Sequence, residues 1–381
     1  IELFADAHIR SVDMPKSKID LDVEKPEHTV ESFTVEVGKT PLSQLFNILE
    51  KNPVWQFKAK DIVAVAHRIV HGGEQTKSQR LTPQLIEDIE SLSALAPLHN
   101  PASIAGINAA MAQVDKNIPH FAVFDTAFHH NLPAKASTYG IPANLAEKFL
   151  IKRYGFHGIA HQSLWKIYEN LRKQKNDKDR KVITLQLGNG CSMAAISEGR
   201  SLDTTMGFTP GEGLLMGTRA GDLDTGVVGF LCKHTGESVD QINRMLNSES
   251  GLLGVSGVAS DMKTLSSHMD QPRVQLAVDL FCYRIIKYIG SYAAVLGGVD
   301  ALIFSGGIGE NSPYIRKEIA KKMSWIGLKI DEELNERVSN LQPAEVHKIS
   351  VADSSFEVYV IGSNENAFIA QEVVNMFEAE A

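Results

Sequence analysis

The chain has 381 residues, 43% of them hydrophobic and 22% charged, and its formal net charge is -8 at pH 7. This length allows two domains, and the composition is ordinary for a globular protein. The negative charge argues against a nucleic-acid-binding surface, which needs a basic face. It does not exclude an anionic small-molecule substrate, because a few local arginines set the field in a cleft.

Three widely spaced cysteines, Cys191, Cys232 and Cys282, form no CxxC or Cys/His pattern. We therefore expect no structural zinc site, and we expect a reducing, cytoplasmic compartment. The sequence contains no apolar run long enough to span a bilayer and no signal peptide, so we expect neither a membrane nor a nucleic acid as a partner.

In the N-terminal third of the chain, the pattern of polar and apolar residues predicts short strands. Residues 17–40 are polar and charged, which is typical of edge strands and turns, and buried strands are predicted at 62–66 and 121–124. The second of these ends at Asp125. An acid at the end of a strand in an open α/β sheet points into the ligand crevice; the alternative for Asp125 is a helix N-cap.

The rest of the chain alternates predicted helices and strands. In chain order these are a helix from Ser163, a hairpin of strands at 182–187 and 193–197, a helix at 273–296, a strand at 300–304, a helix from Ser312, a strand at 356–361 and a C-terminal helix after 362–366. The charged run at 172–181 predicts a solvated connection, with a binding patch as the alternative. These elements predict a mixed α/β fold with ligands at strand ends.

Two glycine-containing segments follow buried strands. Gly188-Asn189-Gly190 has the usual chemistry of a hairpin turn, so it is weak functional evidence on its own. Gly306-Gly307-Ile308-Gly309 lies between a predicted strand and a predicted helix, where bare backbone lets an anionic or flat ligand approach closely. The chain has no Walker A loop and no GxGxxG fingerprint. The segments therefore predict a phosphate site of another kind.

Basic side chains stand beside such breaks. Arg68 and Arg219 have the planar fork that binds phosphate and carboxylate, although a surface ion pair is the alternative for either one alone. His99 and His157 are candidates to donate to a phosphoryl oxygen. Composition does not separate them from the other histidines of these segments, which are His67, His71, His129, His130 and His161.

No His/Asp/Glu cluster has the spacing of a transition-metal site. We therefore expect any metal to be magnesium, held partly by nucleotide phosphates, with Glu365 as the acid near it.

Taken in order, these segments resemble the acetate kinase family, of the acetate and sugar kinase, heat-shock chaperone and actin superfamily. The shared motifs run from about Ile62 to the C-terminal helix and are AHRIVHGGE, APLHNPAS, VFDTAFH, RYGFHGIAH, LGNG, DTTMGFTPGEGLLMGTRAGD, SGLLG and SGGIGEN. The resemblance implies two ribonuclease H-like (actin-like ATPase) domains with a cleft between them. Their expected extents are 1–127 plus 366–381 for the N-terminal domain and 128–365 for the nucleotide-binding domain.

The resemblance also implies an activity: reversible transfer of the ATP γ-phosphoryl group to acetate, with Mg²⁺ (or Mn²⁺), in a cytoplasmic homodimer. Arg68 and Arg219 would bind the carboxylate and the phosphoryl group, His157 would hydrogen-bond that group, and Asp125 would orient an arginine. His99 would lie near the phosphoryl group, and the acyl methyl group would contact Val70, Leu98, Phe156 and Pro210. ATP would contact Gln186, Leu187, Gly188, Asn189, Gly190, Asp261, Met262, Lys263, Gly306, Gly307, Ile308, Gly309, Glu310 and Asn311, and Glu365 would support magnesium.

The sequence departs from the family pattern at several positions. Gln186 stands where the family usually has His, Met262-Lys263 replaces Phe-Arg, Thr225 replaces Pro, and Asn366 replaces Glu. The family's first strand and Ser-rich phosphate loop find no match in these residues, and a protein lacking them is expected not to bind magnesium nucleotide. The alternatives are a propionate or short-chain acyl kinase and a non-catalytic actin-like nucleotide-binding protein. The paired arginines and the acyl pocket argue against the second.

Overall fold

The computed structural model describes residues 5–10, 18–23, 29–34, 41–51, 58–96, 99–173 and 180–380. The chain forms two compact units, unit 1 (Ile1–Phe124 with Asn366–Ala381) and unit 2 (Asp125–Glu365). The predicted roles of an N-terminal acetokinase domain and a C-terminal nucleotide-binding domain stay predictions. Within the described residues, no helix has both the length and the apolar character needed to cross a bilayer.

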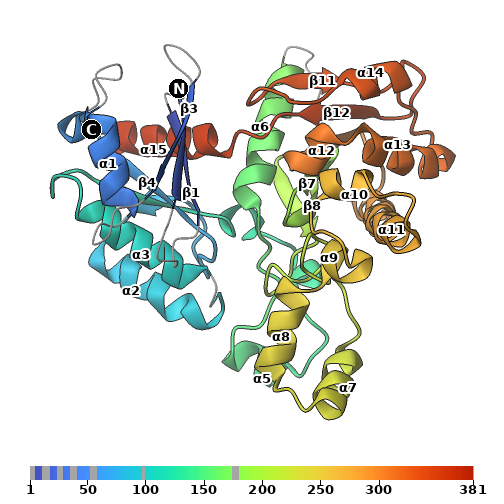
Figure 1. Cartoon of the computed structure of the whole chain (residues 1–381), viewed down its shortest axis with the longest axis horizontal. Helices are drawn as coiled ribbons and strands as arrows, with labels where there is room; N and C mark the ends of the chain where they lie inside the picture. The colour runs from blue at the N-terminus through green and yellow to red at the C-terminus, as the bar shows by residue number, and fades with distance from the viewer. Residues whose placement is uncertain are drawn as a thin grey trace. The chain divides into compact units, whose positions relative to one another are not determined.

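Unit 1 contains two small sheets (Figure 1). The first is antiparallel and consists of β1 (Ala5–Arg10), β2 (Lys18–Val23) and β3 (Thr29–Thr34). The second has the order β4-β6-β5 and consists of β4 (Val65–Ile69), β5 (Gln79–Arg80) and β6 (His120–Phe124). The helices of this unit are α1 (Pro41–Lys51), α2 (Pro83–Ser91), α3 (Asn100–Met111) and nearly all of α15 (Glu365–Glu380).

The strand predicted at 62–66 is wrong in its position. β4 begins at Val65, where its parallel pairing with β6 starts opposite His120. Val63 is 70% exposed and follows a 3₁₀ turn at Ala59–Asp61, so the first residues of the apolar run precede the strand and lie outside the sheet. The strand predicted at 121–124 is confirmed, because β6 is buried at every position and ends at Phe124.

Unit 2 is built on a six-stranded sheet of order β11-β12-β10-β7-β8-β9. Its strands are β7 (Lys181–Leu187), β8 (Cys191–Ser197), β9 (Arg200–Thr204), β10 (Ala301–Ser305), β11 (Val346–Lys348) and β12 (Glu357–Ile361). The central strands β12, β10 and β7 are parallel, and β7, β8 and β9 form an antiparallel meander. All four strands predicted in this part of the chain are confirmed, with ends within two residues of the prediction.

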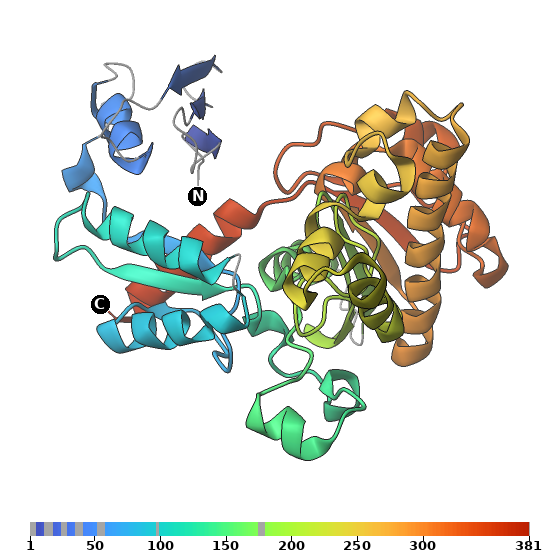
Figure 2. The same cartoon turned by 60° about the horizontal axis from the view of Figure 1, so that its bottom comes forward.

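Helices α6 and α11 are two of the helices that pack on this sheet. α6 (Gly158–Lys173) packs Leu164, Trp165 and Tyr168 onto Val182, Ala194, Ile196 and their neighbours. The long helix α11 (Pro272–Leu296), seen at the side of unit 2 in Figure 2, contacts β7, β8 and β9. The predicted helix at 273–296 is therefore confirmed. The remaining helices of this unit are α4 (Ala134–Ser137), α5 (Ala143–Lys148), α7 (Thr225–Thr235), α8 (Val239–Ser248), α9 (Gly251–Ser256), α10 (Met262–Ser266), α12 (Gly306–Asn311), α13 (Pro313–Lys322) and α14 (Glu332–Arg337).

The helix predicted from Ser163 begins earlier, at Gly158, for a steric reason. The Gly158 N–H donates to the Asp125 carbonyl oxygen at 2.9 Å. A Cβ at this position would lie only 2.2 Å from that oxygen, so glycine is needed for the helix to start against the Asp125 backbone. The apolar stripe that marks the helix in the sequence is confined to its later turns.

The segment at 306–311 is a short helix, α12, rather than the predicted glycine turn. Gly306 has φ +76, and the Glu310 carboxylate accepts from the Gly306 N–H at 2.8 Å. Ser312 then separates α12 from α13, which starts at Pro313 and not at the predicted Ser312. In the charged run, Arg172 pairs with Glu357, and residues 174–179 lie outside the described part of the chain.

Candidate active site

His157 lies in a sharp turn in front of α6. It has φ +56, in the left-handed region that non-glycine residues seldom occupy, and Gly155 before it has φ +75. A side chain on Gly155 would meet Thr204 at 2.6 Å and His129 at 2.8 Å, so the turn is pressed against the sheet. Between them, Phe156 is 1% exposed. Left-handed residues held by their surroundings cluster at functional sites, and here the turn directs the ring toward β8, where Nδ1 lies 2.9 Å from Ser192 Oγ.

Arg219 comes from the long connection between β9 and α7 and reaches the same place. Its Nη1 donates to the Pro210 carbonyl at 3.2 Å. A Cβ placed on Gly190 would lie 3.5 Å from this Nη1 and 3.5 Å from Nε2 of His157. The two donors therefore border one spot over the bare backbone of the β7–β8 turn. Burial lowers the pKa of the Arg219 guanidinium, although an arginine stays charged in proteins.

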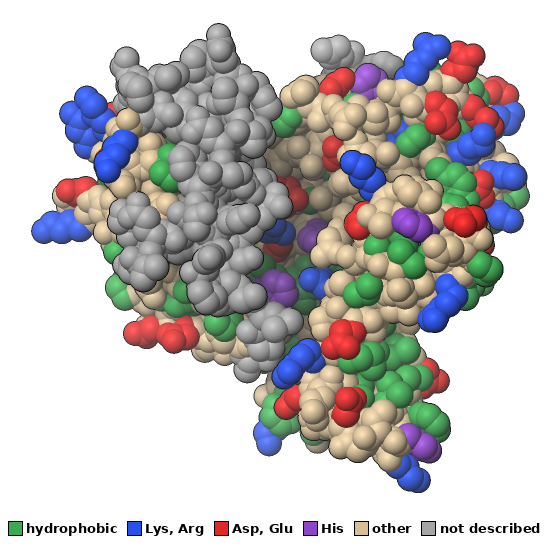
Figure 3. All heavy atoms as spheres, viewed as in Figure 1, with side chains coloured by type: hydrophobic (Ala, Val, Ile, Leu, Met, Phe, Trp, Pro, Cys, Tyr) green, Lys and Arg blue, Asp and Glu red, His purple; other side chains and the backbone are tan. Residues whose placement is uncertain are grey.

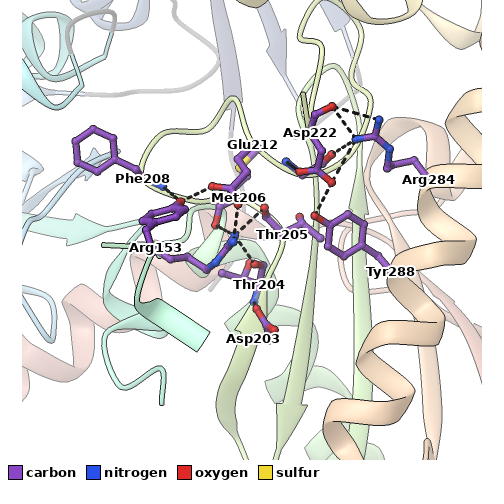
Figure 4. Close-up of polar contacts among 12 residues, drawn as sticks. Arg153, Asp203, Thr204, Thr205, Met206, Phe208, Glu212, Asp222, Arg284 and Tyr288 are labelled. Atoms are coloured by element: carbon purple, nitrogen blue, oxygen red, sulfur yellow. Dashed lines mark hydrogen bonds and ion pairs between the residues drawn. The ribbon is translucent and has the colours of Figure 1, made fainter. Parts of the chain in front are cut away.

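The connection that carries Arg219 has little regular structure, and polar side chains hold it (Figure 4). Arg153 Nη1 donates to the carbonyls of Thr204, Thr205 and Met206 at 3.0, 3.1 and 3.2 Å, and Nη2 pairs with Glu212 Oε1 at 2.5 Å. Tyr139 also donates to Glu212. One guanidinium thus joins the end of β9 to the middle of the connection.

A second polar centre fixes the far end of the connection against α11. The Asp222 carboxylate accepts from the Gly213 N–H at 2.9 Å and from the Tyr288 hydroxyl at 2.8 Å, and it lies 3.3 Å from Arg284 Nη1. Burial, and then the nearby Asp222 charge, raise the pKa of Tyr288, which keeps this hydroxyl a donor. We did not predict Arg153, Glu212, Asp222, Arg284 or Tyr288 as site residues. Arg153, Glu212 and Asp222 stand within the shared motifs RYGFHGIAH and DTTMGFTPGEGLLMGTRAGD, whereas no motif marks Arg284 or Tyr288.

A cavity of about 680 Å³ opens in unit 2 at the β7–β8 turn, a volume typical of small-molecule sites. Eight residues predicted to contact ATP line it: Gly188, Asn189, Asp261, Met262, Lys263, Gly307, Ile308 and Asn311. The lining also includes Ser260, Ser266, Ser312, Ser339 and Asn340, of which we predicted none. Asn340 joins through a contact distant in sequence, because its N–H donates to Asn311 Oδ1 at 2.7 Å.

The other predicted nucleotide residues do not line this cavity: Gln186, Leu187, Gly190, Gly306, Gly309 and Glu310. The Glu310 carboxylate is turned inward, where it accepts from Ser305 Oγ at 3.3 Å and from the Ser363 N–H at 3.0 Å. It therefore ties the ends of β10 and β12 together. Leu187 is fully buried.

Gln186 and Glu365 lie together at the ends of β7 and β12, with 3.4 Å between Gln186 Nε2 and Glu365 Oε1. The Gln186 Oε1 atom is buried and has no hydrogen-bond partner within the described residues. In the part of the chain that the structure describes, no group of three or more His, Cys, Asp or Glu side chains has the arrangement of a metal site. One carboxylate with an amide oxygen fits a magnesium ion that takes its other ligands from phosphate and water.

Several predicted substrate residues belong to unit 1. Arg68 is an exposed residue of β4, Val70 follows that strand, and His99 occupies the N-cap position of α3. Leu98 lies outside the described residues. Asp125, which begins unit 2, is 1% exposed. It is not the cap of the 3₁₀ helix at Ala127–His129, because Thr126 holds that position.

Of the competing histidines, His71, His129 and His161 are buried and His67 is partly buried. His129 bonds Ser201 Oγ at 2.8 Å and the Phe156 carbonyl at 3.1 Å, and burial lowers its pKa to about 4. In unit 1, His67 stacks on His120, and burial, followed by the charge of His120, lowers the pKa of His67 to about 4. Both are neutral near pH 7 and act as packing groups.

Comparisons with known proteins agree over nearly the whole chain. Residues 2–371 match the model of the Acetokinase family. An acetate kinase of Chloroherpeton thalassium is 45% identical, over 82% of this chain and 75% of the relative, and one of Bacteroides thetaiotaomicron is 42% identical, over 94% and 87%.

Solved structures give the same result. Porphyromonas gingivalis acetate kinase matches with a TM-score of 0.89 and 34% identity over 99% of this chain and 94% of that chain. A propionate kinase of Francisella tularensis matches with a TM-score of 0.87 and 36% identity over 97% and 92%. These matches confirm the predicted α/β fold of two actin-like domains. The predicted family is confirmed as well: the chain belongs to the acetokinase family.

Proposed function

We infer that this protein is an acetate kinase, which transfers the γ-phosphoryl group of ATP reversibly to acetate and gives acetyl phosphate and ADP. The observation that carries the inference is the meeting of His157 Nε2 and Arg219 Nη1 over Gly190, in a chain of the acetokinase family. Two hydrogen-bond donors at bare backbone are what a transferring phosphoryl group requires.

The chemistry asks little covalent help of the protein. Acetate is already a carboxylate, so its oxygen attacks phosphorus without first losing a proton, and no general base is needed. Charge on the phosphoryl oxygens spreads in the transition state, and fixed donors stabilise it. In this proposal Arg219 and His157 donate to those oxygens, Arg68 binds the carboxylate, and Asp125 orients an arginine.

The acyl group is proposed to contact Val70, Leu98, Phe156 and Pro210, and His99 is proposed to lie near the phosphoryl group. Phe156 is buried next to His157, and Pro210 holds Arg219 through its carbonyl. A second candidate function, a propionate kinase, is favoured by the 36% identity to the Francisella propionate kinase. One methylene in an apolar pocket separates the two substrates by only about 1–3 kcal/mol.

ATP is proposed to bind in the 680 Å³ cavity, with its phosphates directed along Gly188 to Gly190 toward His157. Glu365, positioned by Gln186, would hold magnesium. When bound, the ion would neutralise phosphate charge and orient the nucleotide. Lys263 stands where the family pattern has an arginine near the adenosine. A lysine ammonium can donate hydrogen bonds, but it lacks the planar stacking face of arginine.

A cytoplasmic homodimer is proposed from the family. Unit 2 offers apolar surface for a dimer: Figure 3 shows hydrophobic side chains gathered near α7 and α8, where Phe230 is 59% and Val239 56% exposed. Leu276 and Tyr283, seven residues apart on one face of α11, are each 59% exposed. Sedimentation at several concentrations tests this, and a monomer throughout would contradict it.

Acyl phosphate formation tests the function directly. The protein with Mg²⁺ and ATP is supplied with acetate, propionate or butyrate, and the acyl phosphate is trapped with hydroxylamine. We expect acetate to give the highest kcat/KM. Preference for propionate would select the second candidate, and ADP release without any acyl phosphate would contradict both.

A further inference from the structure

A chain of buried side chains leads from the centre of the unit 2 sheet to His157. His157 Nδ1 lies 2.9 Å from Ser192 Oγ, Ser192 Oγ lies 2.7 Å from His161 Nε2, and His161 Nδ1 lies 2.7 Å from Thr184 Oγ1. Thr184, Ser192 and His161 are each 0% exposed. None of the three lines the cavity.

The fold explains how these groups meet. Thr184 on β7 is two residues from Val182, and Ser192 on β8 is two residues from Ala194. Each therefore shares a face of the sheet with a core residue, and this is the face that α6 covers. His161 stands on the stripe of α6 that continues through Leu164, Trp165 and Tyr168. An apolar side chain would fit this core at the positions of Thr184, Ser192 and His161. The presence of three hydrogen-bonded polar side chains there therefore needs an explanation.

Donors and acceptors in this chain have one consistent direction. The Thr184 hydroxyl has His161 Nδ1 as its one hydrogen-bond partner within the described residues, so it donates there, since otherwise its buried hydrogen would have no acceptor. Neutral His161 then carries its proton on Nε2 and donates to Ser192 Oγ. Ser192 has one hydrogen, which goes to its other partner, Nδ1 of His157.

The neutrality of His161 has a physical cause. It is enclosed in the core, with His129 at 5.7 Å between ring centroids. Burial, followed by the charges that His129 and His157 could carry, lowers the pKa of His161 well below its ordinary range.

We propose that Thr184, His161 and Ser192 form a directional hydrogen-bond relay that fixes His157 as the neutral tautomer with its proton on Nε2. That proton then points to the spot over Gly190 that Arg219 also borders. A second proton on Nδ1 would leave the Ser192 hydrogen without an acceptor, so the relay also opposes charging of His157. His157 is thereby a fixed neutral donor to the phosphoryl group, in a role that rests on the proposed function. The three relay residues are positioning residues.

The first test is spectroscopic and needs no substrate. Long-range ¹H–¹⁵N correlation spectra of the histidine-labelled, ligand-free protein report the tautomer of each ring, and His157→Gln assigns the His157 signals. We expect His157 to carry its proton on Nε2 near neutral pH. A proton on Nδ1 would overturn the relay even if the protein proved to be an acetate kinase.

The second test uses matched substitutions. Ser192→Ala removes the group next to His157, and Thr184→Val removes only a hydroxyl, while Thr184→Ser retains it. We expect Ser192→Ala to lower kcat about 10–100-fold with little change in the KM for ATP, as loss of an orienting partner does elsewhere. Thr184→Val should mix the two His157 tautomers and lower kcat to a smaller extent, and Thr184→Ser should restore both.

The control is Ser350→Ala, which removes a buried hydroxyl beside strand β12 of the same sheet. Ser350 is 9% exposed, and its Oγ accepts from the Val358 N–H at 3.1 Å, outside the relay. We expect it to lose thermal stability as Thr184→Val does but to keep the wild-type tautomer and kcat. Equal kcat and equal tautomer populations in Thr184→Val and the wild type would overturn the proposal. Absence of acyl phosphate in the wild type would contradict the function and leave the spectra to decide on the relay.

Discussion

At the scale of single residues, the site depends on the positions of two hydrogen-bond donors, His157 and Arg219, beside the backbone of Gly190. His157 is held by a left-handed turn, and Arg219 is held by the carbonyl of Pro210. Gly190 supplies no side chain between them. Fixed donors of this kind need no reorganisation during the reaction, which is why their removal is costly.

Arg219→Ala removes one donor and its charge. We expect kcat to fall by about 10²–10³-fold, the usual effect of deleting one preorganised donor. Arg273→Ala is the control, because Arg273 donates to the Val255 carbonyl at 3.2 Å on an exposed part of α11. The measurement is the steady-state rate of acetyl phosphate formation. Equal losses of kcat in both variants would contradict a specific role of Arg219 as a donor to the phosphoryl group.

Gly190→Ala tests the open spot itself. Its Cβ would make ordinary contacts at 3.4 to 3.5 Å, so the fold should tolerate the methyl group. The methyl group would occupy the place proposed for the phosphoryl group, and we expect kcat to fall about 10²-fold or more with an unchanged melting temperature. Gly229→Ala, with open space around it in α7, should leave kcat unchanged and should not lower the melting temperature, since alanine is the better helix former. Full activity of Gly190→Ala would place the phosphoryl group elsewhere.

At the scale of elements, the critical piece is the connection between β9 and α7. It carries Pro210 and Arg219 with little regular structure, and Arg153 and Asp222 fix its two ends. Charged hydrogen bonds to backbone groups take the place of a helix or strand here. Loops positioned by a rigid scaffold commonly carry function.

Glu212→Gln weakens the first of these centres. Arg153 and Glu212 are 17% and 29% exposed, so their pairing is only partly screened by water. We expect a loss of about 2 kcal/mol in the free energy of unfolding and a fall in kcat, because Arg219 would be less well placed. Urea unfolding and kcat are measured on the same preparation.

The control is Asp353→Asn, which breaks the pair of Lys329 and Asp353, 53% and 71% exposed. We expect no measurable change, since exposed pairs contribute little. If Glu212→Gln behaved like the control, the network around Arg153 would not be what holds the connection.

The sequence predicted part of unit 2, namely α6, α11 and the strands β7, β8, β10 and β12, because the patterns of these elements are local, and it did not predict β9, β11 or the helices α7 to α10. The stripe of α11 and the buried runs of β7, β10 and β12 need no knowledge of distant residues. β4 was misplaced because pairing with β6, and not apolar content, decides where it starts. α12 was missed because its first glycine is held by Glu310 through a side-chain contact.

The candidate site was predictable only in part for the same reason. Motif residues such as His157 and Arg219 stand beside glycines, which leave a signal in the sequence. Ser339 and Asn340 enter the cavity through folding of a distant segment, and no local pattern marks them. His161 looked like one of several histidines until its partners Thr184 and Ser192 were located.

At the scale of the whole molecule, buried neutral histidines make stability depend on pH. Burial lowers the pKa of His67 and His129 to about 4 and lowers the pKa of His161 well below its ordinary range. In the unfolded chain histidine titrates near pH 6.5. Between about pH 4 and 6.5 the unfolded state therefore binds more protons than the folded state, and stability falls as the pH falls through this window.

Urea unfolding over this range checks the sign. We expect the free energy of unfolding to decrease steadily from neutral pH toward pH 4, and His67→Gln to show a shallower decrease because one of these titrations is removed. A free energy that did not change across the window, or that rose with acid, would contradict the assignment of these rings as neutral.

The central claim is that this protein joins the γ-phosphoryl group of ATP to an oxygen of acetate. The most direct test supplies acetate labelled with ¹⁸O at both oxygens, together with Mg²⁺ and ATP, and follows the products by ³¹P NMR. We predict an acetyl phosphate signal shifted by one ¹⁸O bound to phosphorus, with formation strongly reduced in Arg219→Ala. Release of inorganic phosphate and ADP without acetyl phosphate, or acetyl phosphate without ¹⁸O at phosphorus, would contradict it.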